Sequence, residues 1–447
     1  MKRILRRSIL IVLAIAVFLS GMTVYYVKMS VNGENWALFP TNRHIFSNGL
    51  IVKAGKITDK NGVILASTEN GKRVYNSSED VRKSTVHAVG DLKGYISTGI
   101  HSAYLKELCG YDALNGVYNV NGKGNNIELT LDSNICQTAL KALGKYSGTV
   151  GVYNYKTGEM VCMVSNPTFD PETEIKPKGD GVYVNRFLSG VYAPGSVFKL
   201  VTTLAALENI NNIDDINFKC SRGVTIAGEW LSCMGNHGNI NIDNALVYSC
   251  NAFFAQLTLK VGKNNMIKTA EKVGFNKKIK MGKIECAESI YDVKNSNEID
   301  FGWSGIGQHN DLVNPYQYLS FVGAIANKGV CVEPFIVSKI TSYSGLNIEK
   351  HSKSTKRLLS EENSKRLTQM MRNNVKKNYG DYHFSGMNVC GKTGTAEIGK
   401  KANEHSWFTG FCIDEEKPYA FAVVVENAGS GNGAAIRIAA NVLKSIN

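Results

Sequence analysis

The first 28 residues restrict the architecture of this chain more than any other segment. An uncharged run from Ser8 to Val27 follows the basic flank MKRILRR and ends before Lys28. As a helix that rises about 1.5 Å per residue, this run spans about 30 Å, the thickness of the hydrocarbon core of a bilayer. Because basic flanks stay on the cytoplasmic side, the pattern predicts a cytoplasmic segment at 1–7, a transmembrane anchor at 8–28 and an extracytoplasmic remainder.

A cleaved signal peptide is the alternative interpretation of this segment. Ser20 and Gly21 supply small residues, but the run has no clear Ala-x-Ala cleavage site. Tyr25 and Tyr26 suit the interfacial belt of an anchor that is retained. We therefore expect a single-pass protein of the cell membrane.

The net charge bears on the partners of the chain. The chain carries +13, of which the basic flank holds four charges, so about +9 lies beyond the anchor. The basic residues are spread out rather than clustered with aromatic ones. This distribution does not favour nucleic acid and suits an anionic cell envelope.

Ten cysteines are scattered along the chain without a Cys-x-x-Cys pair. Cys220, Cys233 and His237 have side chains that can bind metals, but their spacing matches no common metal site. A disulfide or buried thiols explain the cysteines more simply, and we expect Cys250 to be a small packed thiol. We expect no metal and no cofactor.

The pattern of strands and helices predicts an α/β (α+β) fold. Residues 29–140 combine short strands and turns, as in GKITDKNGVILAST, and form a predicted membrane-proximal pedestal. In 141–447, a strand pair in GTVGVYNYKTGEMVCMVSNP precedes several helices, and three further strands follow them. One antiparallel sheet that collects strands from both ends of this second domain, flanked by helices, accounts for the order. The expected helices lie near 196–208, 243–261, 315–328 and 432–446, and the late strands lie near 387–396, 405–413 and 419–427.

A serine and a lysine open an apolar helix in YAPGSVFKLVTTLAALEN. Helical spacing puts Ser196 and Lys199 one turn apart on the same face. Alone, such a pair is most simply a serine cap beside a solvated lysine. Acyl transfer by serine also needs a base, a proton carrier and oxyanion donors, which the serine-lysine version takes from Ser-x-x-Lys, Ser-x-Asn and Lys-Thr-Gly, in that order.

The chain offers one Ser-x-x-Lys, and each later motif has a competing candidate. The Ser-Gly-Asn at 430–432 lies in a glycine-rich linker, and the Lys-Thr-Gly at 156–158 lies at a hairpin tip, where a turn glycine is expected. The Ser-Cys-Asn at 249–251 opens an amphipathic helix, and the Lys-Thr-Gly at 392–394 lies on a strand. Only the second pair follows Ser196 in the required order and setting.

Longer stretches carry a family resemblance. They include TNRHIF, GKITDKNGVILA, NRFLSGVYAPGSVFK, HGNINIDNALVYSCNAFFAQL, GKTGTAE and SWFTGF, in this order. They resemble the class B penicillin-binding proteins, which are monofunctional transpeptidases, and the pedestal is shorter than is usual there. Ala54 stands where that family usually has arginine, and His309 stands where it usually has glycine. The resemblance implies the serine β-lactamase/penicillin-binding-protein fold and a bacterial peptidoglycan D,D-transpeptidase without metal or cofactor.

The resemblance also implies roles for single residues. Ser196 is the expected nucleophile toward D-alanyl-D-alanine, and Lys199 is its base. Ser249 is expected to pass the proton to the leaving amine, and the charge of Lys392 to keep Lys199 neutral. The implied oxyanion donors are the backbone N–H groups of Ser196 and Thr395. The implied substrate-binding residues are Asn251, Thr393, Gly394 and Thr395.

The implied partners are peptidoglycan stem peptides, β-lactam antibiotics and a polytopic glycan polymerase. A rival enzyme is a hydrolase, either a D,D-carboxypeptidase or a β-lactamase. A class A β-lactamase needs a Glu-x-x-x-Asn loop, and the nearest sequence, ESIYD at 288–292, lacks the asparagine. A β-lactam-sensing ectodomain and a scaffold with an inactive site are further alternatives.

Overall fold

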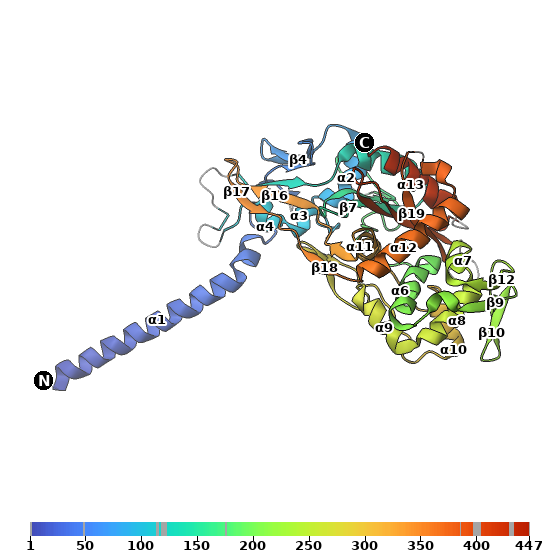
Figure 1. Ribbon diagram of the computed structural model, residues 1–447. Helices are drawn as coiled ribbons and strands as arrows, with labels where there is room; N and C mark the ends of the chain where they lie inside the picture. Colours follow the sequence, from blue (N-terminus) through green and yellow to red (C-terminus); the bar gives the residue numbers. More distant parts are fainter. Residues whose placement is uncertain are drawn as a thin grey trace.

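A five-stranded antiparallel sheet, in the order β19-β20-β21-β7-β8, forms the centre of the larger part of the molecule (Figure 1). Its strands are β7 (Gly148–Asn154), β8 (Met160–Asn166), β19 (Val389–Ala396), β20 (His405–Cys412) and β21 (Tyr419–Val425). β21 pairs with β7, with Val425 opposite Gly148. Strands from the two ends of 141–447 thus meet in one sheet, which confirms the predicted fold. This computed structural model describes residues 2–47, 50–112, 116–117, 123–174, 177–384, 386–396, 404–428 and 433–446.

Helices cover both faces of this sheet. α11 (Pro315–Ala326) and α12 (Glu361–Asn374) pack on one face, and α5 (Ser133–Leu143) and α13 (Ala434–Lys444) pack on the other (Figure 1). Accordingly, β7, β8 and β21 bury side chains at successive positions rather than at every second one. The further helices are α2 (Glu79–Val89), α3 (Ile100–Ala103), α4 (Leu105–Leu108), α6 (Lys199–Asn209), α7 (Ile242–Val247), α8 (Asn251–Val261), α9 (Lys263–Lys272) and α10 (Glu298–Ser304).

A six-stranded sheet, in the order β17-β16-β6-β3-β4-β5, lies near the N-terminal helix. The expected hairpin in GKITDKNGVILAST contributes β3 and β4, with Ile57 opposite Ala66. β6 pairs with β16, with Ile127 opposite Ile340, so this sheet takes strands from both sides of residue 140. The domain division at residue 140 stays a prediction. The strands are β3 (Ile57–Thr58), β4 (Ile64–Glu69), β5 (Lys72–Tyr75), β6 (Asn126–Leu129), β16 (Val337–Thr341) and β17 (Asn347–Lys350).

Short strand pairs complete the described part of the chain. They are β1 (Phe46–Ser47) with β2 (Leu50–Ile51), β9 (Asn217–Cys220) with β12 (Gly238–Asn241), β10 (Gly223–Ile226) with β11 (Glu229–Ser232), β13 (Ile279–Met281) with β14 (Ile284–Cys286), and β15 (Val330–Val332) with β18 (Thr355–Arg357). The pairs formed by β9 to β12 lie at the end of the molecule far from the N-terminal helix (Figure 1).

The N-terminal helix α1 (Lys2–Ala37) projects away from the folded body (Figure 1). It is long and apolar enough to cross a membrane, and the side chains of its apolar run do not pack against the rest of the molecule. An ion pair at 2.7 Å between Lys106 and Glu34 joins the far end of the helix to the body. The helix therefore fits a single-pass membrane anchor.

One predicted helix differs from the structure. The apolar pattern at 243–261 predicts one continuous helix, but α7 ends at Val247 and α8 begins at Asn251. Between them Ser249 takes a left-handed backbone conformation, with φ of 53°. A right-handed helix excludes this conformation. The break places Ser249 at a turn instead of within a helix.

Candidate active site

Ser196 lies on a tight turn that only glycine at position 195 permits. A 3₁₀ turn over Gly195–Val197 leads directly into α6. Gly195 has φ of 53°, and a Cβ atom on it would lie 2.2 Å from the carbonyl oxygen of Thr395. Other residues do not tolerate this combination of conformation and contact. The turn therefore packs against β19 and brings Ser196 beside the Lys-Thr-Gly strand.

The amine of Lys199 lies at the centre of the site. Its Nζ is 2.9 Å from Ser196 Oγ, and it is 2.7 Å from both the Ser249 carbonyl oxygen and Asn251 Oδ1. The last two oxygens only accept hydrogen bonds, so a neutral amine directs its two N–H groups to them. Its lone pair is then left for a hydroxyl group, and Ser196 is in reach.

Asn251 helps to hold the amine of Lys199 in this orientation. Its Nδ2 donates to the carbonyl oxygen of Ser232 at 3.2 Å, which turns its Oδ1 toward Lys199. The side chain of Asn251 therefore serves as a fixed acceptor for Lys199 and links the site to the end of β11.

Ser249 bridges the two lysines of the site. Its Oγ is 3.0 Å from Lys199 Nζ and 3.1 Å from Lys392 Nζ. The left-handed conformation of Ser249 is uncommon for a residue other than glycine, and such strained residues cluster at functional sites. A hydroxyl in this position can pass a proton between a lysine and a bound molecule.

Burial controls the protonation of both lysines. Both side chains are fully buried. Burial lowers the pKa of Lys199 well below its usual value, and the nearby charge of Lys392 lowers it further. Burial also lowers the pKa of Lys392, to about 7. The charge of Lys392 thus favours the neutral form of Lys199.

A cavity of about 450 Å³ opens above this network. Ser196 and Ser249 line it, together with Asn251, Thr393 and Thr395. The structure thus brings together Ser196, Lys199, Ser249, Asn251, Lys392, Thr393 and Thr395. Ile306 and Gln308 form a further part of the cavity wall.

Gly394 faces away from the cavity. A Cβ atom on it would lie 2.6 Å from the carbonyl oxygen of Pro194, in the nucleophile segment. The close approach of that segment therefore explains the glycine. A direct part of Gly394 in substrate binding stays a prediction.

The competing motifs lie elsewhere. The Lys-Thr-Gly at 156–158 occupies the turn between β7 and β8, where Asn154 Oδ1 accepts from the backbone N–H groups of Lys156 and Thr157. It does not line the cavity. The Ser-Gly-Asn at 430–432 lies outside the described residues.

Two further residues belong to the site and were not identified from the sequence. Tyr379 lies with its hydroxyl 3.2 Å from Lys392 Nζ and accepts from the backbone N–H of Thr393 at 3.4 Å. Glu404 is the carboxylate among the described residues that line the cavity. Neither belongs to a local motif, so no spacing pattern marks them. Glu288, of the ESIYD stretch, is exposed and does not line the cavity.

Comparisons with known sequences agree on one family. Residues 148–447 match the model described as the penicillin-binding protein transpeptidase domain. The peptidoglycan D,D-transpeptidase PbpA of Mycobacterium tuberculosis is 26% identical over 336 residues, which are 68% of this chain and 68% of that relative. Stage V sporulation protein D of Bacillus subtilis is 30% identical over 326 residues, which are 68% of this chain and 50% of that relative.

Solved structures share the fold. The crystal structure of PBPA from Mycobacterium tuberculosis covers 88% of this chain and 99% of its own, with a TM-score of 0.78 and 24% identity. The D,D-transpeptidase domain of a peptidoglycan glycosyltransferase from Eggerthella lenta covers 88% and 97%, with a TM-score of 0.77 and 26% identity. A ceftriaxone acyl-enzyme complex of penicillin-binding protein A from M. tuberculosis covers 88% and 98%, with a TM-score of 0.79 and 24% identity.

Proposed function

This chain belongs to the penicillin-binding protein transpeptidase family, and we propose that it is a class B peptidoglycan D,D-transpeptidase that works through an acyl-enzyme on Ser196. Relatives named peptidoglycan D,D-transpeptidase support the activity. The observation that carries the role of Ser196 is the 2.9 Å approach of Lys199 Nζ to its Oγ, beside the bridging hydroxyl of Ser249.

In the first step, Ser196 Oγ attacks the carbonyl carbon between the two D-alanines of a stem peptide. The neutral amine of Lys199 takes the hydroxyl proton, because its two N–H groups already point to Ser249 and Asn251. The C–N bond then breaks, Ser249 passes the proton to the departing amine, and D-alanine leaves. A neighbouring stem peptide's amine attacks the ester in the second step, restores the serine hydroxyl and completes the cross-link.

Hydrogen-bond donors around the cavity support the binding of the stem peptide that provides the acyl group. The backbone N–H groups of Ser196 and Thr395 are the proposed oxyanion donors. Thr393 and Thr395 lie two apart on β19 and therefore point the same way, toward the substrate carboxylate. Asn251 is the proposed contact for the peptide's amide. β-Lactam antibiotics mimic the same donor and are proposed to acylate Ser196 in its place.

We place this enzyme in a bacterial cell membrane, with α1 as its single anchor and its folded part outside the cytoplasm. The basic flank before the apolar run supports this orientation. Its proposed protein partner is a polytopic glycan polymerase, which supplies strands to be cross-linked. The chain is not proposed to bind nucleic acid.

Acylation by benzylpenicillin is expected to be fast at neutral pH and to slow as the pH falls. Below the lowered pKa of Lys199, its amine is protonated and cannot accept the Ser196 proton. The rate constant should then fall about tenfold per pH unit, and it should reach a plateau well below about pH 10.4, the ordinary lysine pKa. Stopped-flow measurement of acylation between about pH 5 and pH 10 checks this. A rate that still rises tenfold per unit up to pH 10 contradicts the burial argument.

The acyl-enzyme is expected to persist for many minutes and to react with amines. A transpeptidase lacks a base that activates water, and such a base is commonly worth about 10²–10⁴-fold in rate. D-Amino acids added with a D-alanyl-D-alanine donor should appear in the product peptide. Mass spectrometry of the products and of the penicilloyl protein over time measures both effects.

Glu404 sharpens this test because it supplies a carboxylate to the cavity. If Glu404 activated water, the chain would be a hydrolase. Penicilloate would then be released rapidly, and Glu404→Gln would slow that release. We expect instead that Glu404→Gln leaves the lifetime of the penicilloyl form unchanged within about twofold, far below the effect of a lost general base.

A further inference from the structure

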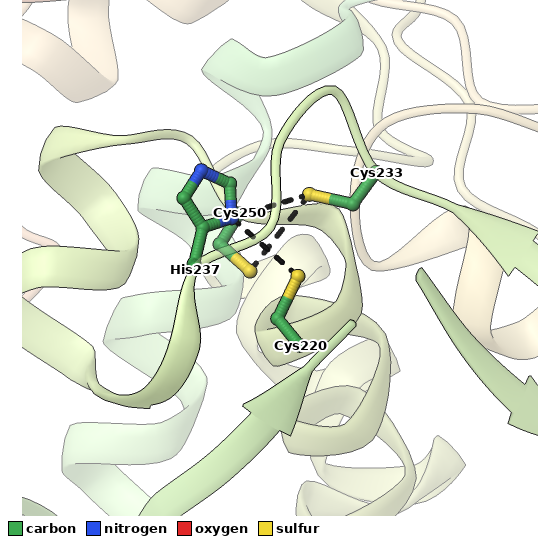
Figure 2. Close-up of side chains that lie close together, drawn as sticks. All are labelled: Cys220, Cys233, His237 and Cys250. Carbon is green, nitrogen blue, oxygen red and sulfur yellow. Dashed lines mark hydrogen bonds between the residues drawn. The ribbon is translucent and has the colours of Figure 1, made fainter. Parts of the chain in front are cut away.

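Four metal-binding side chains converge beside the catalytic cavity, outside the network described above (Figure 2). We call them the Cys–His cluster: Cys220, Cys233, His237 and Cys250. Their three Sγ atoms and the His237 Nδ1 atom all lie within 4.8 Å of one another. We propose that the Cys–His cluster binds one structural zinc ion, which fixes the catalytic Ser-Cys-Asn turn at 249–251.

The distances within the cluster fit a tetrahedral ion. With zinc–sulfur bonds of about 2.3 Å and zinc–nitrogen bonds of about 2.0–2.1 Å, tetrahedral ligands lie about 3.8 Å apart for two sulfurs and about 3.5 Å apart for sulfur and nitrogen. Cys233 Sγ lies 3.9 Å from Cys250 Sγ. His237 Nδ1 lies 3.5 Å from Cys220 Sγ and 3.5 Å from Cys233 Sγ. The ligand atoms thus surround a space of the right size.

The type of ligand favours zinc. Three thiolates and one imidazole form a closed structural set that zinc prefers, and sulfur-rich tetrahedral sites exclude magnesium and calcium. Because all four positions are protein ligands, the site leaves no place for substrate or a reactive water. Binding releases the thiol protons to solvent.

The surroundings hold the ligands in place. The backbone N–H of Asn251 donates to Cys233 Sγ at 3.3 Å, and that of Phe253 donates to Cys250 Sγ at 3.4 Å. Cys250 is therefore the N-cap of α8, a position where serine, threonine, aspartate or asparagine is usual. The ring of His237 stacks on Tyr248, with centroids 5.7 Å apart. Such contacts to the ligands tune and orient metal sites.

The ligands come from four separate elements. Cys220 ends β9, Cys233 follows β11, His237 precedes β12 and Cys250 caps α8. β9–β12 and β10–β11 are separate two-stranded sheets, which are marginal on their own. A metal would join both sheets to α8, in addition to the small apolar cluster of Ile226, Leu231, Ala255 and Ile299.

The position of the cluster links it to the reaction. Cys250 stands between Ser249, with its left-handed backbone, and Asn251, which holds Lys199. Cys233 itself lines the catalytic cavity, as does Met234. An ion that fixes Cys233 and Cys250 therefore fixes one wall of the cavity and the geometry of the bridging serine. This positioning role rests on the proposed transpeptidase function, whereas the metal site does not.

A disulfide explains the cluster less well. An S–S bond needs about 2.05 Å, and the ten cysteines are all free. A disulfide between two of the three cysteines would also leave the third thiol and the side chain of His237 without a role in the cluster. A metal uses all four side chains.

Metal analysis of the full chain in detergent, purified with a thiol reductant, tests the site. We expect one zinc per chain, and after exchange to cobalt the visible bands of a tetrahedral ion with a thiolate-to-cobalt charge-transfer band. Cys220→Ser should lower that band by about a third or abolish it, because one of three thiolates is lost. Cys286→Ser, a matched control at a partly buried cysteine outside the cluster, should leave it unchanged.

The absence of stoichiometric zinc together with a missing charge-transfer band overturns the site. So does a chain two daltons lighter that carries a disulfide within the cluster. These readouts use the unaltered chain, so a variant that fails to fold does not decide the outcome.

The positioning role is tested by labelling with a fluorescent penicillin before and after removal of zinc by a chelator. We expect labelling to slow by roughly tenfold or more and to recover when zinc is added back. Equal rates with and without metal overturn the positioning role and leave the site itself standing. If the zinc-loaded chain is not labelled at all, the proposed transpeptidase function fails, and the cobalt spectrum still decides the metal site.

Discussion

Replacing Ser196 by alanine is expected to abolish covalent labelling by benzylpenicillin. The reaction needs an oxygen nucleophile 2.9 Å from the amine of Lys199, and alanine removes it. The loss should exceed about 10³-fold, as for other serine acyl-transfer enzymes without their nucleophile. Intact-mass measurement of the full chain in detergent, before and after the antibiotic, should show one adduct for the unaltered protein and none for Ser196→Ala.

The nearby Ser189→Ala variant is the matched control. Ser189 is exposed and does not line the cavity, so this variant should gain the adduct at the unaltered rate. Peptide mapping of the unaltered protein should find the adduct on the peptide that contains Ser196. An adduct that persists in Ser196→Ala would assign the nucleophile elsewhere.

Replacing Lys199 by methionine is expected to slow acylation by about 10²–10⁴-fold, the usual worth of a general base. Methionine keeps most of the volume of the buried side chain but offers no lone pair to the Ser196 proton. Lys392→Met should slow acylation by about 10²-fold, because the charge that keeps Lys199 neutral and the donor to Ser249 are lost. Rates of labelling by a fluorescent penicillin measure these effects.

Lys156→Met serves as the control for both lysine variants. Lys156 belongs to the competing Lys-Thr-Gly, in the turn between β7 and β8, and the Lys156→Met variant should label at the unaltered rate. Similar losses for positions 156 and 392 would mean that the wrong triplet has been assigned to the site. The thermal unfolding temperature of each variant shows whether slower acylation results from the lost lysine or from a destabilised fold.

Motif order predicted which distant segments of this chain meet. Ser196, Ser249 and Lys392 lie in three segments far apart in sequence, yet their side chains form one hydrogen-bonded network. Acyl transfer by serine requires these side-chain types, so the motifs that contain them can be recognised in the sequence. The turn setting of Lys156 likewise separated the two triplets, because local turn geometry is encoded locally.

Features that depend on contacts between segments could not be predicted. Apolar spacing gave no sign of the helix break at Ser249, because the turn is set by packing around the site and not by helix propensity. Tyr379 and Glu404 reach the site through the fold alone. Features of this kind can be identified only from the three-dimensional arrangement of the chain.

The Cys–His cluster shows why spacing along the chain did not indicate the proposed metal site. Common zinc motifs take ligands from one short loop, whereas these ligands are brought together by strand pairing. Cys220 lies opposite Gly238 in the β9–β12 pair, which brings His237 beside it. Cys250, expected to be a packed thiol, provides the fourth ligand atom. A search for cysteines near the ends of paired strands would have found the set.

The pairing of β6 with β16 determines how early the six-stranded sheet can be completed during synthesis of the chain. Glu128 on β6 and its partner Ser338 on β16 are 210 residues apart in the chain. At a synthesis rate of about 5–20 residues per second, β6 waits about 10–40 s before its partner exists. During that interval one edge of the sheet nearest the anchor stays open, which is the condition under which strands join the wrong neighbour. A chain whose synthesis stops before residue 337 therefore lacks β16, the partner strand of β6, as well as the later motifs. We expect such truncated products to be targets for chaperones and proteases.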